Sequence, residues 1–487
     1  MDYSQFLVMK QEICLLVVFL LVFLNDIFLP RKAQSGIGII TCVLFGIYTL
    51  FGFCPMVIGS DSQTAFAGMY ETSPVIVNIK NILNVGTLIV LIQSLRWTAS
   101  DMQRIRRGEF YDLLLLTLFG MYLMISSRHF LMFVIGLETA SLPLAAMVAF
   151  DKHRYESHEA AVKYILTAVF SSAVFMMGLS FVYGLSGSLY FTNIATQLTI
   201  GVDSIALVVA LAFVIAGIGF KLSLVPFHLW TADVYQGAPT PVTSYLSVIS
   251  KGSAAFAFLV ILWQVFGTVY SEAWEWMLYA LIILTITVGN LFAIRQRNLK
   301  RFLAFSSISQ AGYIMLGVIA YTLDSAMGEA ALMYYILVYI FSNLAAFGVI
   351  GAIENNCGKV SMDDYNGLSK TNPLLAMTMM LAMFSLAGIP PFAGFFSKFF
   401  IFTSAINQGS VAIYVLVLIA LINTIVSLYY YLLVVKAMYI KTEEPCSIAT
   451  FRSACSERIA MWVCVAGIVG LGIVSYFYDN LLTLVGC

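Results

Sequence analysis

Six ionisable side chains stand inside long apolar runs of the sequence. They are Lys80, Glu138, Lys163, Lys221, Lys251 and Lys398. A charge at the centre of a lipid bilayer costs at least about 2.5–3.5 kcal/mol. A helix that carries such a charge therefore turns it toward the protein interior, pairs it, or lets it gain and lose a proton.

Lysine suits proton exchange because burial in a weakly polar site destabilises its charged form. A row of such lysines linked by water is able to pass protons from one to the next. The alternative interpretation is that buried Lys–Glu pairs only hold helices in register, since buried ion pairs are weak indicators of stability. The presence of several lysines, two of them near predicted helix breaks, favours transport.

The lysines differ in their sequence surroundings. Lys221 precedes Pro226 by five positions, and Lys398 follows Pro391 by seven. Lys251 lies in the middle of an apolar run, directly after Ser250. These positions agree with a role in proton exchange.

Three further residues have more ambiguous surroundings. Glu138 and Lys163 stand in consecutive runs, which predicts antiparallel neighbours and an ion pair between the two. Lys80 is close to the predicted start of its helix, so we expect its ammonium to reach the surface. His228 follows Pro226, and its ordinary pKa of about 6.5 suits proton exchange, although a membrane histidine can equally be a packing residue. The other three histidines, His129, His153 and His158, are predicted to lie in solvated connections.

The composition requires a membrane around these charges. The chain has 487 residues, of which 61% are hydrophobic and only 10% charged, with a mean hydropathy of +0.93. Soluble domains have about 25% charged residues, so a soluble globular fold is excluded. The net charge is zero, which gives no indication of nucleic acid as a partner.

Fourteen apolar runs are long enough to span a bilayer, which predicts an all-α integral membrane protein. They lie near 11–29, 36–54, 74–95, 110–127, 130–150, 160–185, 203–225, 240–266, 273–294, 302–321, 327–353, 373–406, 411–435 and 459–478. No small-residue cleavage site follows the first run, which is therefore interpreted as a helix and not as a removable signal.

Prolines interrupt the seventh and twelfth runs, at Pro226 and at Pro390-Pro391. Two broken helices five positions apart are typical of an inverted internal repeat with its site at the breaks. We expect an N-terminal three-helix segment (1–109), two five-helix units (110–266 and 267–440), and a C-terminal loop and helix (441–487).

The distribution of basic residues predicts the orientation. Of the 25 lysines and arginines, eighteen fall in one alternate set of connections, including Arg31, Lys32 and Arg104, and only Lys10 and Arg128 fall in the other. The positive-inside rule then places both termini on the non-cytoplasmic side.

No motif for redox or hydrolytic chemistry is visible in the sequence. The eight cysteines are scattered, without metal-ligand spacing, and no glycine-rich phosphate loop or Ser/His/Asp arrangement is present. The energy for any pumping must come from an ion gradient or from partner subunits.

The segment 220–242, FKLSLVPFHLWTADVYQGAPTPV, resembles the signature of the proton-conducting antiporter-like family. This family comprises the three large membrane subunits of respiratory complex I, the large subunits of multi-subunit sodium/proton antiporters, and relatives in membrane-bound hydrogenases. The resemblance extends to GLE at 136–138, AVKY at 161–164, SKG at 250–252 and LAGIPP at 386–391.

Within the family the chain is most similar to the subunit N branch of NADH–quinone oxidoreductase, the counterpart of mitochondrial subunit 2. The sequence of residues 233–239 and the lysine at 398 fit this branch, and the absence of a long C-terminal arm argues against subunit L. Ala232 departs from the pattern, because proline is expected there. Fourteen runs indicate a bacterial source and therefore a bacterial inner membrane.

The resemblance implies a role for each residue. Glu138 with Lys163 forms the pair that couples the subunit to its neighbours. Lys221 is the central proton carrier, Lys251 the connecting lysine, and Lys398 the exchange residue toward the outside.

The resemblance also implies that the chain works as part of an enzyme while carrying no redox centre. NADH, FMN, iron–sulfur clusters and quinone are expected in partner subunits of the same membrane-bound complex. The partners are a neighbouring antiporter-like subunit, small membrane subunits and the lipid bilayer.

Two alternatives stay open at this point. The chain could belong to a sodium/proton antiporter or a membrane-bound hydrogenase, which share the channel but not the electron source. It could also be a membrane scaffold whose buried charges only fix the packing. Co-purifying NADH- and quinone-binding subunits would distinguish the oxidoreductase from the antiporter.

Overall fold

The computed structural model describes residues 3–28, 36–59, 61–100, 106–199, 204–267, 271–321, 325–407, 409–441, 446–474 and 476–486. The prediction of an all-helical membrane protein is confirmed, because twelve helical segments among these residues are long and apolar enough to cross a membrane. Three shorter apolar helices accompany them, at Ile37–Gly52, Pro373–Ala387 and Ala393–Ile406. Arg31, Lys32 and Arg104, which contributed to the predicted orientation, lie outside the described residues.

The elements follow one another in three stretches of the chain. The first contains η1 (Tyr3–Val8), α1 (Lys10–Phe28), α2 (Ile37–Gly52), α3 (Pro55–Ile58), β1 (Gln63–Ala65), β2 (Tyr70–Thr72) and α4 (Pro74–Thr98). The second contains α5 (Arg107–Ser126), α6 (Phe130–Val148), α7 (Tyr155–Ser186), α8 (Phe191–Leu198), α9 (Ser204–Leu222), α10 (Leu229–Gly237), α11 (Thr240–Tyr245), η4 (Leu246–Ser250), α12 (Lys251–Ile261) and η5 (Leu262–Phe266). The third contains α13 (Ser271–Ile294), α14 (Leu299–Tyr321), α15 (Ser325–Cys357), η6 (Met362–Tyr365), α16 (Leu368–Thr371), α17 (Pro373–Ala387), α18 (Ala393–Ile406), α19 (Val411–Tyr439), α20 (Cys455–Ile473) and α21 (Tyr476–Gly486).

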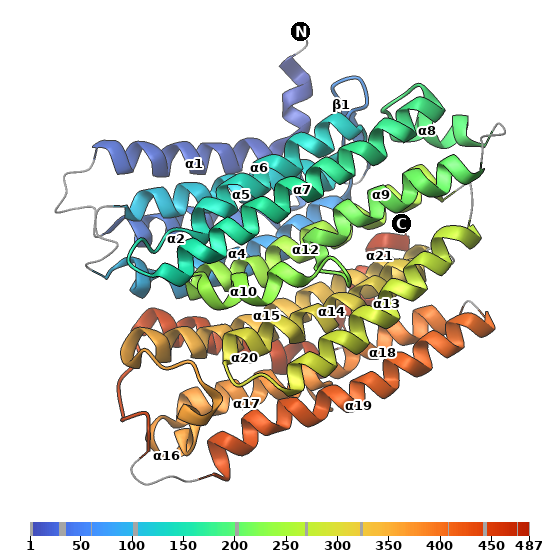
Figure 1. The fold of residues 1–487 in the computed structure, drawn as a ribbon. Helices are drawn as coiled ribbons and strands as arrows, with labels where there is room; N and C mark the ends of the chain where they lie inside the picture. The colour runs from blue at the N-terminus through green and yellow to red at the C-terminus, as the bar shows by residue number, and fades with distance from the viewer. Residues whose placement is uncertain are drawn as a thin grey trace.

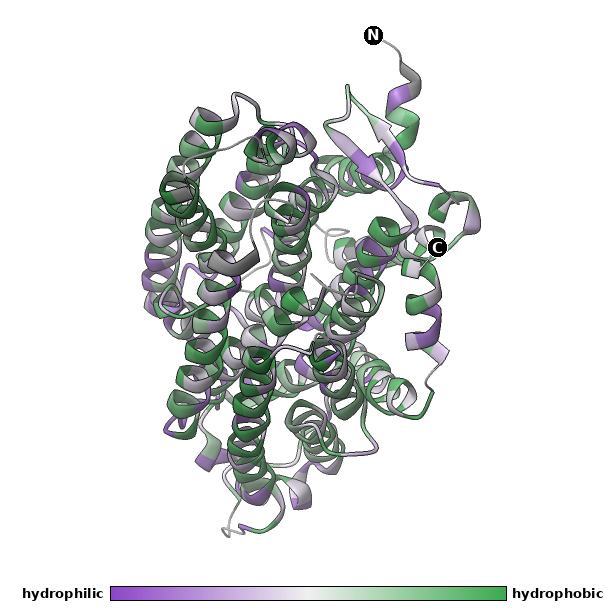
Figure 2. Ribbon diagram, turned by 90° about the vertical axis from the view of Figure 1, so that its right-hand side faces the viewer, coloured by the Kyte–Doolittle hydropathy of each residue, from purple (hydrophilic) through white to green (hydrophobic). Residues whose placement is uncertain are grey.

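The long helices run side by side to form one bundle (Figure 1). Seen from its end, the ribbons are mostly apolar, and the polar β1–β2 hairpin projects near the N-terminus (Figure 2). This antiparallel hairpin, in which Thr64 pairs with Glu71, is an addition to the predicted all-α fold.

Helix α14 lies at the centre of the bundle. Its membrane-spanning window is buried along its whole length, and it packs against α10, α12, α13, α15 and α18. Unlike a simple apolar core helix, it carries Ser306, Ser307, Ser309 and Gln310 among its buried residues. Polar side chains in such a place need partners from the surrounding helices.

The chain leaves the helical path at both of the proline positions noted in the sequence. Helix α9 ends at Leu222 and α10 begins at Leu229, while α17 ends at Ala387 and α18 begins at Ala393. At the first interruption the backbone N–H of Val225 donates to Oγ1 of Thr285 (3.0 Å), and the indole N–H of Trp230 donates to the carbonyl of Phe220 (3.1 Å). Other helices thus satisfy the backbone groups that the interruption frees, as an apolar environment requires.

Helices α5 and α6 approach each other at two glycines. A Cβ placed on Gly136 would lie 2.8 Å from backbone atoms of both Gly120 and Met124, and a Cβ on Gly120 would meet the backbone N of Ala140 at 2.4 Å. Small residues allow this kind of close helix packing in membranes. The contact fixes the position of α6, which carries Glu138 and Ser141.

We predict that Gly136→Ala destabilises the protein by about 1–3 kcal/mol, the usual range for an overpacked interior. The thermal denaturation midpoint of the gently extracted protein measures the effect. Gly184→Ala is the matched control, because a Cβ there has no atom within 4 Å. Equal midpoints for the two variants would show that the α5–α6 contact is not as tight as described.

Candidate functional site

Lys221 lies in the last turn of α9, next to the first interruption, and is buried. Its ammonium donates to the hydroxyl of Ser141 on α6 and, at 3.4 Å, to that of Tyr164 on α7. It also lies 5.8 Å from the centre of the Tyr164 ring. Glu138 interacts electrostatically with Lys221 but makes no ion pair within 4.0 Å with it.

Lys251 is the first residue of α12 and follows the π-helical turn η4. Its Nζ donates to Oγ of Ser307 at 2.6 Å and to the carbonyl of the same residue at 3.3 Å. The ring of Tyr235 on α10 lies 5.5 Å away. The side chain is 1% exposed, so Ser307 of α14 is the main polar contact of this ammonium.

Lys398 reaches back across the second interruption. From α18 its Nζ donates to the carbonyls of Leu386 (3.0 Å) and Ala387 (3.3 Å), at the end of α17. These carbonyls belong to the last turn of a helix, where no backbone N–H is available to them and the helix dipole is negative. The ring of Tyr313 lies 5.0 Å from the ammonium.

Hydrogen bonds along α14 run from the surroundings of Lys398 to Ser306, the sequence neighbour of the residue that holds Lys251. Gln310 donates to the carbonyl of Leu386 (3.4 Å) and to the hydroxyl of Tyr431 (3.1 Å). Tyr431 in turn bonds Ser306 at 2.5 Å, and Ser306 precedes the Ser307 that holds Lys251. Helix α14 therefore places polar groups between the two lysines.

His228 lies between the interruption after α9 and the start of α10. Its ring is half-buried and interacts electrostatically with Lys251. Nδ1 is buried and finds no hydrogen-bond partner among the described residues. His228 thus lies close to the group of lysines.

The predicted pairing of Lys163 with Glu138 is wrong. Lys163 instead bonds Asp233 of α10 and Glu159 of its own helix, each at 2.7 Å. Asp233 also pairs with Arg301, at 2.6 Å. The short connection between α6 and α7 does make these helices neighbours, but α10 packs against α7 and supplies the nearer carboxylate.

The expectation that Lys80 reaches the surface is also wrong. Its side chain is 1% exposed, and its Nζ lies 2.5 Å from Glu12 of α1. The sequence showed Glu12 only near the end of a run, so the partner was not recognised. His129, predicted to be solvated, is buried instead, and its Nδ1 accepts the N–H of Leu131. Burial lowers the pKa of this imidazole.

One buried lysine was missed because its position near the start of a helix looked like a connection. Lys300 is 2% exposed and lies 3.4 Å from Glu354, while its Nζ donates to the carbonyl of Ala238 at 2.9 Å. Arg154 pairs with the same carboxylate at 2.7 Å. The only signal in the sequence was the position of Lys300 at the start of a long apolar run.

No metal or disulfide chemistry is visible among the described residues. Nowhere in those ranges do three or more His, Cys, Asp or Glu residues come together as metal ligands. The seven described cysteines are free.

The fold and these buried groups define a multi-pass integral membrane protein with protonatable residues inside its bundle. The family described as NADH:quinone oxidoreductase/Mrp antiporter, TM, matches residues 127–425, and the chain belongs to this family. It is 53% identical over 482 residues to "NADH-quinone oxidoreductase subunit N" of Phocaeicola vulgatus, covering 99% of both chains.

Solved structures show the same architecture. A chain of "Respiratory complex I from Thermus thermophilus with bound Aureothin" is 30% identical, with a TM-score of 0.78, covering 95% of this chain and 97% of that one. A chain of "Structure of Mrp complex from Dietzia sp. DQ12-45-1b" has a TM-score of 0.81 at 21% identity, covering 100% and 97%. This second likeness concerns the fold alone.

We predict that Ser307→Ala lowers the stability of the protein by about 1–3 kcal/mol, because a buried ammonium loses its nearest acceptor. Thermal denaturation of the extracted protein measures the loss. Ser309→Ala is the control, since the Ser309 hydroxyl donates to the carbonyl of Ser306 in its own helix and bonds Tyr430, but holds no lysine. An equal effect of both substitutions would mean that Ser307 does not hold Lys251.

Proposed function

We propose that the chain is a proton-translocating membrane-arm subunit of an NADH–quinone oxidoreductase in a bacterial inner membrane. Quinone reduction in partner subunits drives the transport, and the buried lysines of this chain carry the protons. NADH, FMN, iron–sulfur clusters and quinone belong to those partners. The proposal draws on the relatives described above and on the partners of the buried lysines.

One observation carries the proposal. The buried lysines fall into two groups, according to whether a carboxylate holds them. Lys80 and Lys300 each form an ion pair, whereas no ion pair between described residues involves Lys221, Lys251 or Lys398. These three ammonium groups contact hydroxyls, carbonyls and aromatic rings, which stabilise a charge less than a carboxylate does.

This difference argues against a purely structural role. A scaffold that needs charges for packing is expected to pair them, because an unpaired buried charge is strongly unfavourable. A lysine surrounded only by neutral oxygen atoms is able to release its proton and remain hydrogen-bonded. Lys221, Lys251 and Lys398 are therefore the proposed carriers, with His228 as an auxiliary group beside Lys251.

We propose the path Lys221 to Lys251 to Lys398. Waters and the tyrosines Tyr164 and Tyr235 bridge its first half, where no continuous chain of side-chain bonds joins Lys221 to Lys251. The hydrogen-bonded groups of α14 form its second half. Glu138, which acts electrostatically on Lys221, adjusts the charge of the first carrier.

Glu138 and Lys163 are also proposed to transmit the state of neighbouring subunits. Glu138 is half-buried, and the Lys163 side chain is 42% exposed, so both can respond to a subunit packed against α6 and α7. A change at Lys163 reaches the interior through Asp233 on α10, which follows the interruption beside Lys221.

The finer topology belongs to the same proposal. Adding α2 and the α17–α18 pair to the twelve candidate spans gives fourteen crossings, with α9–α10 and α17–α18 as the two discontinuous helices. The units 110–266 and 267–440 are proposed as inverted repeats, each with a lysine beside its interruption. Both termini then lie outside the cytoplasm, on the same side as the β1–β2 hairpin.

A sodium/proton antiporter subunit is the second candidate. The similarity to the Mrp complex supports it through the fold. The oxidoreductase is favoured because the relative at 53% identity spans nearly the whole chain.

We predict that Lys221→Met leaves the complex assembled but lowers NADH-driven proton pumping about tenfold or more, because removal of a proton-transfer group costs at least that much. Proton uptake into inverted membrane vesicles, normalised to the amount of assembled complex, measures this. Lys152→Met, in an exposed connection, is the charge-matched control. Normal pumping by the assembled Lys221 variant would rule out the relay.

A further inference from the structure

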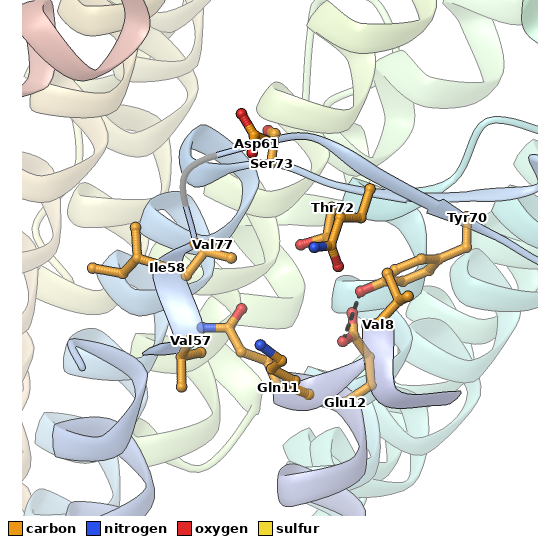
Figure 3. Close-up of a pocket in the computed structure, with 13 residues that line it drawn as sticks. Val8, Gln11, Glu12, Val57, Ile58, Asp61, Tyr70, Thr72, Ser73 and Val77 are labelled. Atoms are coloured by element: carbon orange, nitrogen blue, oxygen red, sulfur yellow. Dashed lines mark hydrogen bonds between the residues drawn. The ribbon is translucent and has the colours of Figure 1, made fainter. Parts of the chain in front are cut away.

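A small pocket opens beside the N-terminal helices, away from the three proposed carriers. It is lined by polar and apolar residues of α1, the segment before β1, β2 and the first turn of α4 (Figure 3). The volume open to the centres of water molecules in this pocket is about 30 Å³. One ordered water needs about 10–15 Å³ of such volume. The pocket therefore has room for water.

The pocket ends at a buried acid. Glu12 and Tyr70 both line it, and Figure 3 shows the Glu12 carboxylate and the Tyr70 hydroxyl pointing toward each other. Tyr70 donates to Oε2 of Glu12 at 2.9 Å, while Lys80 donates to Oε1 at 2.5 Å. Both charged side chains are 1% exposed, so the ion pair is buried but adjoins a pocket that reaches the surface.

Further polar groups continue inward from this ion pair. The Lys80 ammonium lies 5.3 Å from the centre of the Tyr122 ring. Tyr122 donates to Oδ1 of Asn84 and receives a hydrogen bond from Tyr48 at 3.1 Å. Of the surrounding charges, Arg128 acts electrostatically on Lys80.

Two amide atoms in this cluster are buried without a hydrogen-bond partner among the described residues, Oε1 of Gln11 and Nδ2 of Asn84. Gln11 itself lines the pocket. Buried polar atoms of this kind normally bind ordered water. The cluster therefore offers water sites on both sides of the ion pair, one in the pocket and one beside Asn84.

We propose that Glu12, Lys80 and Tyr70 form a second proton-exchange site of this subunit, open to the surface that carries the β1–β2 hairpin. The inference rests on the proposed function. Lys80 passes a proton to the Glu12 carboxylate, which leaves a neutral amine and a carboxylic acid. The acid releases the proton to a pocket water, and a proton arriving from the side of Tyr122 restores the ammonium.

The test compares proton-to-electron ratios of the intact complex in proteoliposomes. The double variant Glu12→Gln with Lys80→Met removes both charges, so neither is left buried without its partner. The site predicts that the assembled double variant oxidises NADH but pumps fewer protons per electron than wild type. Glu71→Gln, which breaks the neighbouring Arg128–Glu71 pair (2.8 Å) outside the pocket, is the control and keeps the wild-type ratio.

The outcomes separate this site from the main path. A wild-type ratio in the double variant would show that the pair is only structural. If Lys398→Met abolishes pumping in the same assay, a wild-type ratio in the double variant contradicts only the second site, and the proposed function stands. If neither Lys398→Met nor the double variant affects pumping, the proposed function fails as well.

Discussion

An ammonium group inside a membrane protein needs oxygen atoms or aromatic rings around it, because several kcal/mol of hydration must be replaced. This chain meets that need in two ways. Carboxylates hold Lys80 and Lys300, and these ion pairs join the helices that carry the partners. Hydroxyls, carbonyls and rings hold Lys221, Lys251 and Lys398, and this weaker stabilisation allows a lysine to alternate between charged and neutral forms.

The architecture of the bundle provides these oxygen atoms in an otherwise apolar interior. A continuous helix uses its own carbonyls, so the end of α17 at Ala387 exposes the acceptors that Lys398 binds. Helix α14 is surrounded on all sides, so it presents Ser307 to Lys251 and Gln310 to the carbonyl of Leu386, which also binds Lys398. The close α5–α6 contact at Gly120 and Gly136 brings Ser141 within reach of Lys221.

The sequence was sufficient for the parts of this account that depend on local pattern. Apolar runs predicted an all-helical membrane protein and most of its long helices, and the ends of α9 and α17 fall close to the prolines at 226, 390 and 391. The sequence did not predict the partners of side chains whose contacts depend on which helices become neighbours. Lys80 was predicted to reach the surface because its partner, Glu12, is 68 positions away in the sequence. Only tertiary packing brings the two side chains together. The same reason explains the partner of Lys163, since nothing local indicates that α10 folds against α7.

The most direct test is whether water joins the carriers inside the bundle. A map of the assembled complex from electron cryo-microscopy, at a resolution that shows ordered waters, can locate them. The account predicts waters bridging Lys221 to Lys251 near Tyr164 and His228, and further waters beside Gln310 on the way to Lys398. Close apolar packing without water between these lysines would contradict it, because protons cannot cross such a gap.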